Sequence, residues 1–358
     1  SDRWVLSSSL QDVLQRFPAA DAMQAMTLAE PGRLYRYTSG AADRMNRIGY
    51  FGTNGLGLVR YDAGVARLER MPFGLLADGV GAIAVTDSGV WVGTTPYTQQ
   101  PTTYVPGFTW LREDLEEFRL DRGQGVPGYR FREVRDIARW KDEWWAATDA
   151  GVVAVGGRRL ETIDRRGGLP ANDTYALAVT TDGLWVGTSR GLAVLHEDGT
   201  SVQVAPGTFD VLAHDERTVW VGGPSGVFRV ADDAGGVTRP MGDPLLREPI
   251  EALAVAKGRV VVATRDQIVW RDSDGGWTRE TPFGDLGRLT ALTADEDGVW
   301  VGGQLGVQYF RFATREFVRA AGPGDLPGAV TDLGASRDFL WVGTEGGLVR
   351  ILKRAVGS

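Results

Sequence analysis

One pattern of apolar and polar positions recurs along almost the whole chain. Its centre is a short apolar run around tryptophan, as in GVWVGTT (Gly89 to Thr95), GLWVGTSRGLAVL (Gly183 to Leu195) and FLWVGTEGGLVRI (Phe339 to Ile351). The anchor position of successive copies is occupied by Tyr50, Trp91, Trp145, Trp185, Trp220, Val261, Trp300 and Trp341. Most anchors are separated by about 40 residues, the size of one propeller blade. The chain therefore contains eight copies of one unit.

Each copy predicts a series of short strands. Eight residues before each of the last seven anchors lies an aliphatic residue, followed by a small residue and a polar turn. These aliphatic residues are Ile83, Ile137, Leu177, Leu212, Leu253, Leu292 and Leu333. A turn glycine after the anchor, such as Gly191 or Gly226, precedes a third alternating strand, and several copies continue into a fourth. The unit is therefore a four-stranded antiparallel meander, and its closely spaced glycines are interpreted as turns.

A single such sheet cannot bury both of its faces, so the units are expected to stack around an axis. The sequence thus predicts an all-β fold: a single β-propeller of about eight four-stranded antiparallel blades, with seven as the alternative if the Tyr50 unit is incomplete. The last unit ends near Lys353 after three strands. We therefore expect an N-terminal strand, from Arg3 to Leu6 or from Met23 to Leu28, to complete the last blade.

The predicted organisation has three parts. Residues 1–32 form an N-terminal segment with the clasp strand and a short helix, whose apolar face is spaced as Leu10, Val13, Leu14 and Phe17. Residues 33–353 form the β-propeller, and residues 354–358 form a C-terminal tail. The first blade is irregular, because Ala42 stands where an aliphatic residue is expected. Its inner strand is predicted at Leu34 to Thr38, paired with Met45 to Gly52.

Composition narrows the classes of function. The 358 residues carry 39 basic and 46 acidic side chains, a formal net charge of -7, which gives no general attraction to nucleic acid or anionic lipid. No apolar run approaches the ~20 residues of a transmembrane helix. The chain has no cysteine and only two histidines, His196 and His214, which excludes thiolate chemistry and a three-histidine metal site. We expect no catalytic residue, no metal and no cofactor.

The unit LWVGT-x-x-GL is preceded by Gly-Leu-Pro at Gly168 to Pro170 and by Asp-Leu-Pro at Asp325 to Pro327. In this arrangement it resembles the two-component-regulator propeller repeat, over nearly the whole chain beyond residue 45. In bacteria that family forms the periplasmic sensor part of hybrid histidine kinases, and it also occurs as free-standing or secreted propellers. The resemblance implies a periplasmic or extracellular protein whose signal peptide has been removed.

The largest departure from the repeat lies between Trp91 and Trp145, which are 54 residues apart. Alignment with the next unit places inserts at Pro96 to Pro106 and Gly123 to Phe131, in two connections that leave a meander on the same face. The inserts therefore predict one protrusion, with a self-packed loop as the alternative. Its candidate partner-binding residues are aromatic and basic, as is typical of interface anchors: Tyr97, Tyr104, Phe108, Tyr129, Arg130, Phe131 and Arg132.

A second set of candidates comes from the inner strands. Two residues before the fixed aliphatic residue, the units carry Gly81, Arg135, Tyr175, Asp210, Glu251, Thr290 and Thr331. This position lies near the start of each inner strand, where the strands surround the mouth of the channel. We therefore expect a ligand site at the channel mouth formed by Arg135, Tyr175, Asp210 and Glu251, with a solvated channel lining as the alternative.

These patterns favour a non-enzymatic binding or scaffolding propeller that engages a protein partner, or an extracellular ligand such as a glycan or small molecule, through its loop face. Two alternatives stay open: an accessory structural subunit of a larger envelope or membrane-associated complex, and a propeller lyase or hydrolase with a polar channel site. The anchor tryptophans are interpreted as core, because they recur at a fixed place in the unit. No nucleic-acid partner and no transmembrane segment are expected.

Overall fold

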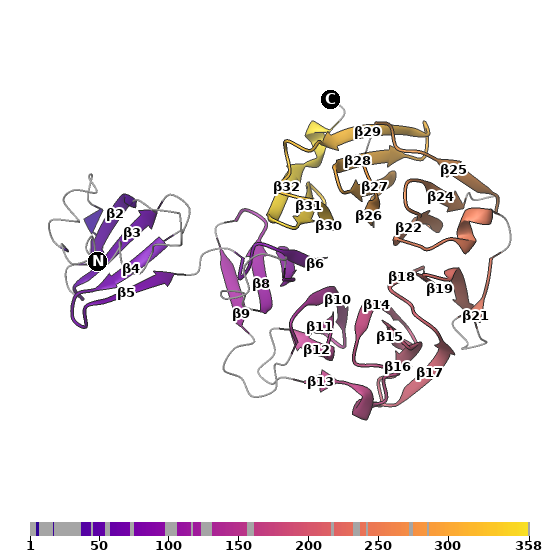
Figure 1. Ribbon diagram of the computed structural model, residues 1–358, viewed down its shortest axis with the longest axis horizontal. Coiled ribbons are helices and arrows are strands. Elements are labelled where there is room, and N and C mark those ends of the chain that lie inside the picture. Colours follow the sequence, from indigo (N-terminus) through magenta and orange to yellow (C-terminus); the bar gives the residue numbers. More distant parts are fainter. Residues whose placement is uncertain are drawn as a thin grey trace. The chain divides into compact units, whose positions relative to one another are not determined.

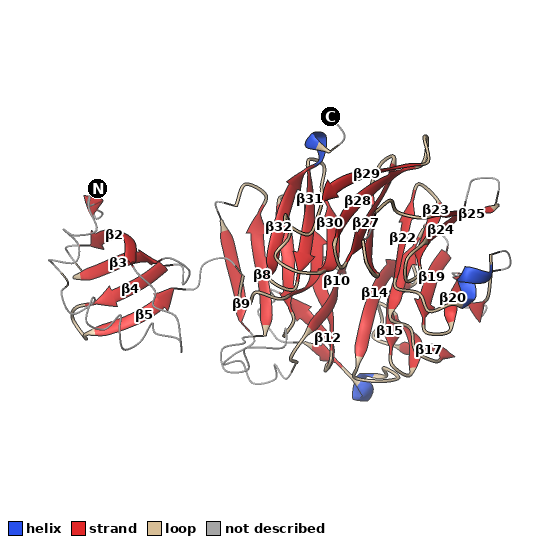
Figure 2. Cartoon of the chain, turned by 45° about the horizontal axis from the view of Figure 1, so that its top comes forward, coloured by secondary structure: helices blue, strands red, loops and turns tan. Residues whose placement is uncertain are grey.

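The computed structural model describes residues 5–6, 17, 37–43, 46–53, 58–71, 75–96, 106–115, 117–122, 131–155, 161–215, 218–231, 237–240, 243–271, 275–284 and 286–356. Within these residues the chain is all-β, with three short 3-10 helices at Arg165–Gly167, Pro244–Arg247 and Lys353–Ala355 (Figure 2). It divides into two compact units, Ser1–Gly74 and Leu75–Ser358. No helix in the described residues is long and apolar enough to cross a membrane.

The first unit holds one antiparallel sheet in the order β1-β2-β3-β4-β5. Its strands are β1 (Val5–Leu6), β2 (Tyr37–Asp43), β3 (Ile48–Thr53), β4 (Leu58–Asp62) and β5 (Arg67–Met71). The core of this sheet is aromatic: the rings of Tyr37 and Phe51 stack at 4.7 Å, and Phe17 packs edge-on against Phe51 and Tyr61. The copy of the repeat around Tyr50, which is the first along the chain, belongs to this unit.

The inner strand of that sheet differs from the prediction. It begins at Tyr37 in the described residues and continues through Ala42, which is buried. In the ladder, Gly40 lies opposite Phe51, whereas the other sheets have Ile or Leu opposite the residue after the anchor, as in Ile83 opposite Val92. The hairpin is therefore longer than in the other copies, and the aliphatic side chain of the inner strand is missing.

The second unit is a ring of seven antiparallel sheets around one axis, among the residues that the structure describes (Figure 1). The first two sheets are β6 (Val80–Val85), β7 (Gly89–Thr94), β8 (Gly107–Arg112), β9 (Phe118–Arg122), and β10 (Val134–Trp140), β11 (Glu143–Thr148), β12 (Gly151–Val155), β13 (Thr162–Ile163). The third and fourth are β14 (Thr174–Thr180), β15 (Gly183–Thr188), β16 (Gly191–Leu195), β17 (Ser201–Pro206), and β18 (Val211–His214), β19 (Thr218–Gly223), β20 (Gly226–Ala231), β21 (Val237–Thr238). The last three are β22 (Ala252–Ala256), β23 (Arg259–Ala263), β24 (Ile268–Arg271), β25 (Trp277–Glu280), then β26 (Leu289–Ala294), β27 (Gly298–Gly303), β28 (Gly306–Arg311), β29 (Glu316–Ala321), and β30 (Val330–Ala335), β31 (Phe339–Thr344), β32 (Gly347–Leu352).

The first and last sheets of the ring lie side by side. The backbone N–H of Ile83 in β6 donates to Oδ2 of Asp332 in β30 at 2.6 Å. The Ser336 hydroxyl donates to Oε1 of Glu113 at 2.5 Å, and the indole of Trp341 packs in one core cluster with residues of β6 and β7. The all-β propeller fold is thus confirmed, with eight sheets in the described residues and seven of them in this ring.

The prediction that an N-terminal strand completes the last blade is wrong for one of its two candidate stretches. In the described residues, β32 pairs with β31 alone, so the last sheet has three strands. Of the candidate stretch Arg3 to Leu6, the described residues Val5 and Leu6 instead pair with β2, where Val5 lies opposite Ala42, and so extend the sheet of the first unit. The other candidate, Met23 to Leu28, lies outside the described residues, as do Leu10, Val13 and Leu14 of the predicted helix.

Small residues two positions after the anchor bring neighbouring sheets close together. A Cβ atom on Gly93 would lie 2.3 Å from Cγ1 of Val134, and one on Gly302 would lie 2.7 Å from Cγ1 of Val330, both in the next sheet. At the join between last and first sheets, a Cβ on Gly343 would lie 2.6 Å from Cγ1 of Val80. All three glycines lie within strands, where close packing between sheets requires them. The interpretation of the closely spaced glycines as turns is therefore wrong for Gly302 of the WVGG segment, which lies inside β27.

Candidate channel-mouth site

The seven variable positions of the inner strands line a single cavity. Gly81, Arg135, Tyr175, Asp210, Glu251, Thr290 and Thr331 come from seven different sheets, and all of them border a space of about 390 Å³ at the centre of the ring. Each lies at or just before the start of an inner strand, two residues before the fixed aliphatic residue. The structure therefore brings together the four residues predicted as ligand candidates, Arg135, Tyr175, Asp210 and Glu251.

Arg135 is held in one orientation by its neighbours. Its guanidinium group bonds Glu133 on its own sheet and Oδ1 of Asp173 at 2.6 Å, and it donates to the carbonyl of Thr174 at 3.0 Å. It also lies 4.5 Å from the centre of the Tyr175 ring. The Tyr175 hydroxyl donates to Oδ2 of Asp173 at 2.8 Å, so this cluster forms a rigid polar wall on one side of the mouth.

The charges of this cluster shift the pKa values of its acidic members. Burial raises the pKa of Asp173, but the hydrogen bonds from Arg135 and Tyr175 outweigh burial and leave that pKa below its ordinary value. The pKa of Tyr175 is raised by burial and by its bond to Asp173. Asp173 therefore stays ionised and Tyr175 neutral at neutral pH.

The other side of the mouth offers polar groups without partners. Oδ1 of Asp210 and the hydroxyl oxygens of Thr290 and Thr331 are buried and have no hydrogen-bond partner among the described residues. Burial, with a smaller contribution from the charge of Glu251, raises the pKa of Asp210 to about 6. Glu251 itself accepts a hydrogen bond from Nη2 of Arg288 at 2.7 Å. Because unpartnered buried polar groups are costly, these three are suited to bind a ligand.

Two further carboxylates line the cavity and were missed by the sequence analysis. Asp136 accepts hydrogen bonds from the backbone N–H groups of Ile137 and Leu177, each at 2.7 Å. Asp332 likewise accepts hydrogen bonds from the backbone N–H groups of Leu333, at 2.8 Å, and of Ile83, at 2.6 Å. Burial raises the pKa of Asp136 to about 6, and burial together with the charge of Asp136 raises the pKa of Asp332 to about 7. A signal was present, since the other five sheets carry Ala or Val at this position.

The histidines do not belong to this site. Nδ1 of His196 lies 2.8 Å from the carbonyl oxygen of Asp182, and His214 is exposed. Neither lines the cavity. The part of the chain that the structure describes contains no group of three or more His, Cys, Asp or Glu side chains that could hold a metal ion. What the cavity offers is hydrogen-bond donors and acceptors with an excess of carboxylates.

The predicted protrusion is described only at its edges. Tyr97, Tyr104, Tyr129 and Arg130 lie outside the described residues. Phe108 and Phe131 are buried, at 0% and 3% exposure, with ring centres 5.5 Å apart in a cluster that includes Val134. These two rings fill the core between the first and second sheets of the ring, so they are removed from the predicted partner-binding surface. Arg132 is exposed, and its backbone N–H donates to Oδ1 of Asp149 at 2.7 Å.

The chain matches no known family model and none of the curated proteins. Among solved structures, it resembles the extracellular domain of a proposed hybrid two component system from B. thetaiotaomicron, at 14% identity over 86% of this chain and 44% of that chain, with a TM-score of 0.61. It also resembles virginiamycin B lyase from Staphylococcus aureus, at 14% identity over 77% of this chain and 94% of that chain (TM-score 0.60). A third is the WD40 propeller domain of Doa1, at 13% identity over 78% and 94% of the two chains (TM-score 0.59).

The chain spans about half the length of the sensor domains that it matches. At such low identities the likeness concerns the fold alone, and this fold is shared by sensor domains, a lyase and a WD40 domain. The seven channel-lining sheets, with the repeat that forms them, are those of a β-propeller.

Proposed function

We propose that the protein is a non-enzymatic binding propeller, exported from the cell, that holds a ligand or a side chain of a protein partner at its channel mouth. The observation that carries the proposal is that one wall of the mouth is held by internal hydrogen bonds, whereas the other has polar atoms available to a ligand. Arg135, Tyr175 and Asp173 are fixed by one another, whereas Asp210, Thr290 and Thr331 have buried polar atoms without partners in the described residues. A preorganised mouth of this kind binds without having to rearrange.

The charge balance favours a ligand that donates hydrogen bonds. Arg135 is compensated by Glu133 and Asp173, and Arg288 by Glu251. The carboxylate of Asp210 has no basic partner among the described residues. We infer that the ligand is an amine, or a basic side chain of a protein partner. Its positive charge would stabilise the ionised carboxylate of Asp210, which loses solvation on burial.

Export and the binding role are supported by the likeness of the fold to extracellular sensor domains. One observation favours the alternative of a lyase or hydrolase. Asp210, with a pKa of about 6, has the acidity of a general base that works near neutral pH.

The test is calorimetric titration of the protein with spermidine, arginine and glucose. We expect an amine to bind and release protons near pH 6, because it would lower the pKa of Asp210. Asp210→Asn should weaken this binding about tenfold or more, whereas Asp297→Asn, which removes an exposed carboxylate outside the cavity, should not. Binding that is equal in wild type and Asp210→Asn, or no binding of either amine, would overturn the proposal, as would chemical conversion of the bound amine detected by mass spectrometry.

A further inference from the structure

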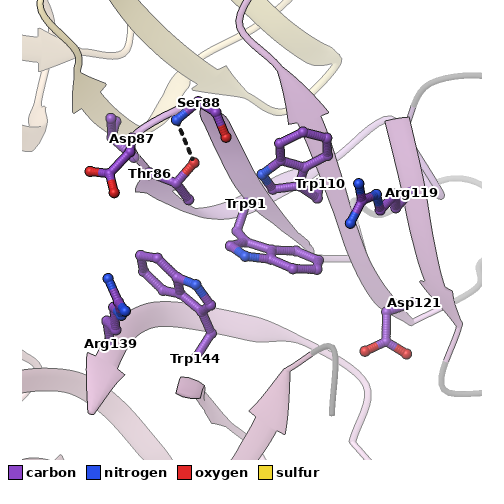
Figure 3. Close-up of a pocket in the computed structure, with 10 residues that line it drawn as sticks. Thr86, Asp87, Ser88, Trp91, Trp110, Arg119, Asp121, Arg139 and Trp144 are labelled. Carbon is purple, nitrogen blue, oxygen red and sulfur yellow. Dashed lines mark hydrogen bonds between the residues drawn. The ribbon is translucent and has the colours of Figure 1, made fainter. Parts of the chain in front are cut away.

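A second hollow lies between the first two sheets of the ring, apart from the channel. It has a volume of about 810 Å³ and shares no lining residue with the channel cavity. Its walls carry three tryptophans: Trp91 of β7, Trp110 of β8 and Trp144 of β11. Figure 3 shows the three indoles gathered around this hollow, with Arg119 beside Trp110 and Arg139 beside Trp144. We call it the tryptophan groove.

The groove exists because the repeat fails at this place. The residue before the anchor is Trp144 in the second sheet of the ring, whereas the other sheets have aliphatic residues there that are at most 2% exposed: Val90, Leu184, Val219, Val260, Val299 and Leu340. Arg139, two residues after the fixed aliphatic residue, also stands where five of the other sheets have Val or Ala. A position that serves the core elsewhere has therefore been given to a large aromatic side chain that reaches solvent.

The burial of the anchor changes at the same place. Trp145, Trp185, Trp220, Trp300 and Trp341 are 1–3% exposed, as their role in the core requires. Trp91 is only partly buried, and so are Trp110, which lies opposite it in the ladder, and Trp144. Leaving three indoles partly in water forgoes burial energy, which makes a purely structural role a poor account of them. Five of the anchor tryptophans are thus fully core residues, whereas Trp91 packs against a core cluster with part of its indole exposed.

Charged groups at the rim determine what the groove can accept. The guanidinium of Arg119 lies 5.0 Å from the centre of the Trp110 ring and bonds Oε1 of Glu117, while Arg139 bonds Oδ1 of Asp142 at 3.1 Å. Asp87 and Asp121 line the same hollow, so acidic and basic groups are balanced in number. The carboxylates at the rim disfavour a phosphorylated ligand, and the Arg119 guanidinium already occupies the place over the Trp110 ring where a cationic ligand would lie. Flat apolar faces with donors and acceptors around them suit a neutral ring that has apolar faces and a polar rim.

We propose that the tryptophan groove binds a neutral oligosaccharide. A pyranose presents C–H faces that pack on indole rings, and its hydroxyl groups can bond guanidinium and carboxylate groups at the rim. The volume of the groove lies within the range of small-molecule sites and has room for more than one sugar ring. The proposal is independent of the channel mouth, since the two sites share no residue.

The ring contains its own comparison. An equivalent hollow of about 700 Å³ lies between the last two sheets and is lined by Trp300 and Tyr309. There the indole of Trp300 is 2% exposed and donates to Oδ2 of Asp295 at 2.8 Å, and Lys353 bonds the same carboxylate. Among the residues that the structure describes, no second indole lines this hollow. Tyr309→Ala in this hollow is therefore a control for Trp110→Ala in the groove.

The test is titration of the purified protein with cellohexaose, xylohexaose, maltohexaose and chitohexaose. Binding is monitored by tryptophan fluorescence and by calorimetry. At least one is expected to bind saturably and to change the emission of the groove tryptophans. The decisive variant is Trp144→Leu, which restores the residue that Leu184 provides in the next sheet and so should fold normally. It should weaken binding about tenfold or more, as should Trp110→Ala.

Three further results bear on the proposal. Tyr309→Ala and Asp210→Asn should leave oligosaccharide binding unchanged, so that a failure of the channel proposal is distinguished from a failure of this one. Absence of binding for all four oligosaccharides at millimolar concentration would overturn the proposal. So would unchanged affinity in a folded Trp144→Leu protein, which would place the sugar elsewhere.

Discussion

The Oδ2 atom of Asp136 accepts a hydrogen bond at 2.7 Å from the backbone N–H of Leu177, which lies in the inner strand of the next sheet. Asp332 makes the same bond to Ile83 at the join between the last and first sheets. In both cases a side chain satisfies a main-chain donor of the neighbouring sheet. At two of the seven contacts between neighbouring sheets, a buried carboxylate therefore binds a main-chain N–H of the next inner strand in addition to the apolar packing.

Replacing Asp136 with alanine is expected to lower the free energy of unfolding by about 1–3 kcal/mol, because two buried N–H groups lose their acceptor. Urea unfolding followed by fluorescence measures the change. Asp297→Ala, at an exposed carboxylate, should change stability far less. An Asp136→Ala protein as stable as wild type would contradict this prediction. It would mean that the second sheet, like the five sheets with Ala or Val at this position, does not need a carboxylate there.

The stability of the ring is expected to fall as pH rises from about 4 to about 7. Asp136 and Asp210 have folded pKa values of about 6 and Asp332 of about 7, all above the ordinary value near 3.8. In this window the folded state binds more protons than the unfolded state, so the stabilisation is complete below the unfolded pKa and is lost through the folded values. Urea unfolding at several pH values in this window tests the slope.

Asp210→Asn should flatten that slope, because one of the three titrating groups is removed. Carboxyls with lowered pKa values, such as Asp173 and Asp243, act in the opposite sense, and their stabilisation is lost only as pH falls below the ordinary range. A stability that rises steadily from pH 4 to pH 7 would contradict the assignment of the three buried carboxyls.

Gly302→Ala is expected to destabilise the protein by about 1–3 kcal/mol, since its methyl group would overlap Val330 of the next sheet. Gly324→Ala is the matched control, because a Cβ there would meet no heavy atom within 4 Å. Thermal unfolding of the two variants side by side decides the matter. Equal melting temperatures would mean that neighbouring sheets can separate at little cost.

Trp300→Ala should lower the free energy of unfolding by about 3–5 kcal/mol, because it removes a fully buried side chain and its hydrogen bond to Asp295. Trp144→Leu should change it by less than about 1 kcal/mol, since the indole it removes is partly exposed. Chemical denaturation of both variants provides the comparison. Similar losses would remove the distinction between core tryptophans and groove tryptophans.

The regular part of the fold could be predicted from the sequence because it depends on local spacing. The constant interval between Ile83 and Trp91 sets the hairpin register in which Ala84 lies opposite Trp91, and the other ring sheets repeat it. The same register places position 135 and its equivalents at the channel mouth. Period and offset were sufficient, since each hairpin is built from neighbouring residues.

Contacts between sheets could not be predicted in this way. Phe108 packs against Phe131, which follows it by 23 residues. Trp91 lines the same hollow as Trp144, which belongs to the next sheet. These properties belong to pairs of residues distant in the sequence, which a repeat pattern does not relate.

The mouth of the channel is lined by seven residues from seven different sheets, and six of them carry side chains. Gly81 cannot be varied, because a Cβ atom there would overlap the carbonyl oxygen of Val134 in the next sheet. The other six positions carry side chains of different size and charge on hairpins of the same register. The mouth thus combines six variable side chains with one constant backbone frame. Saturation mutagenesis of these six codons, with Gly81 kept, would give a library that varies binding at the mouth.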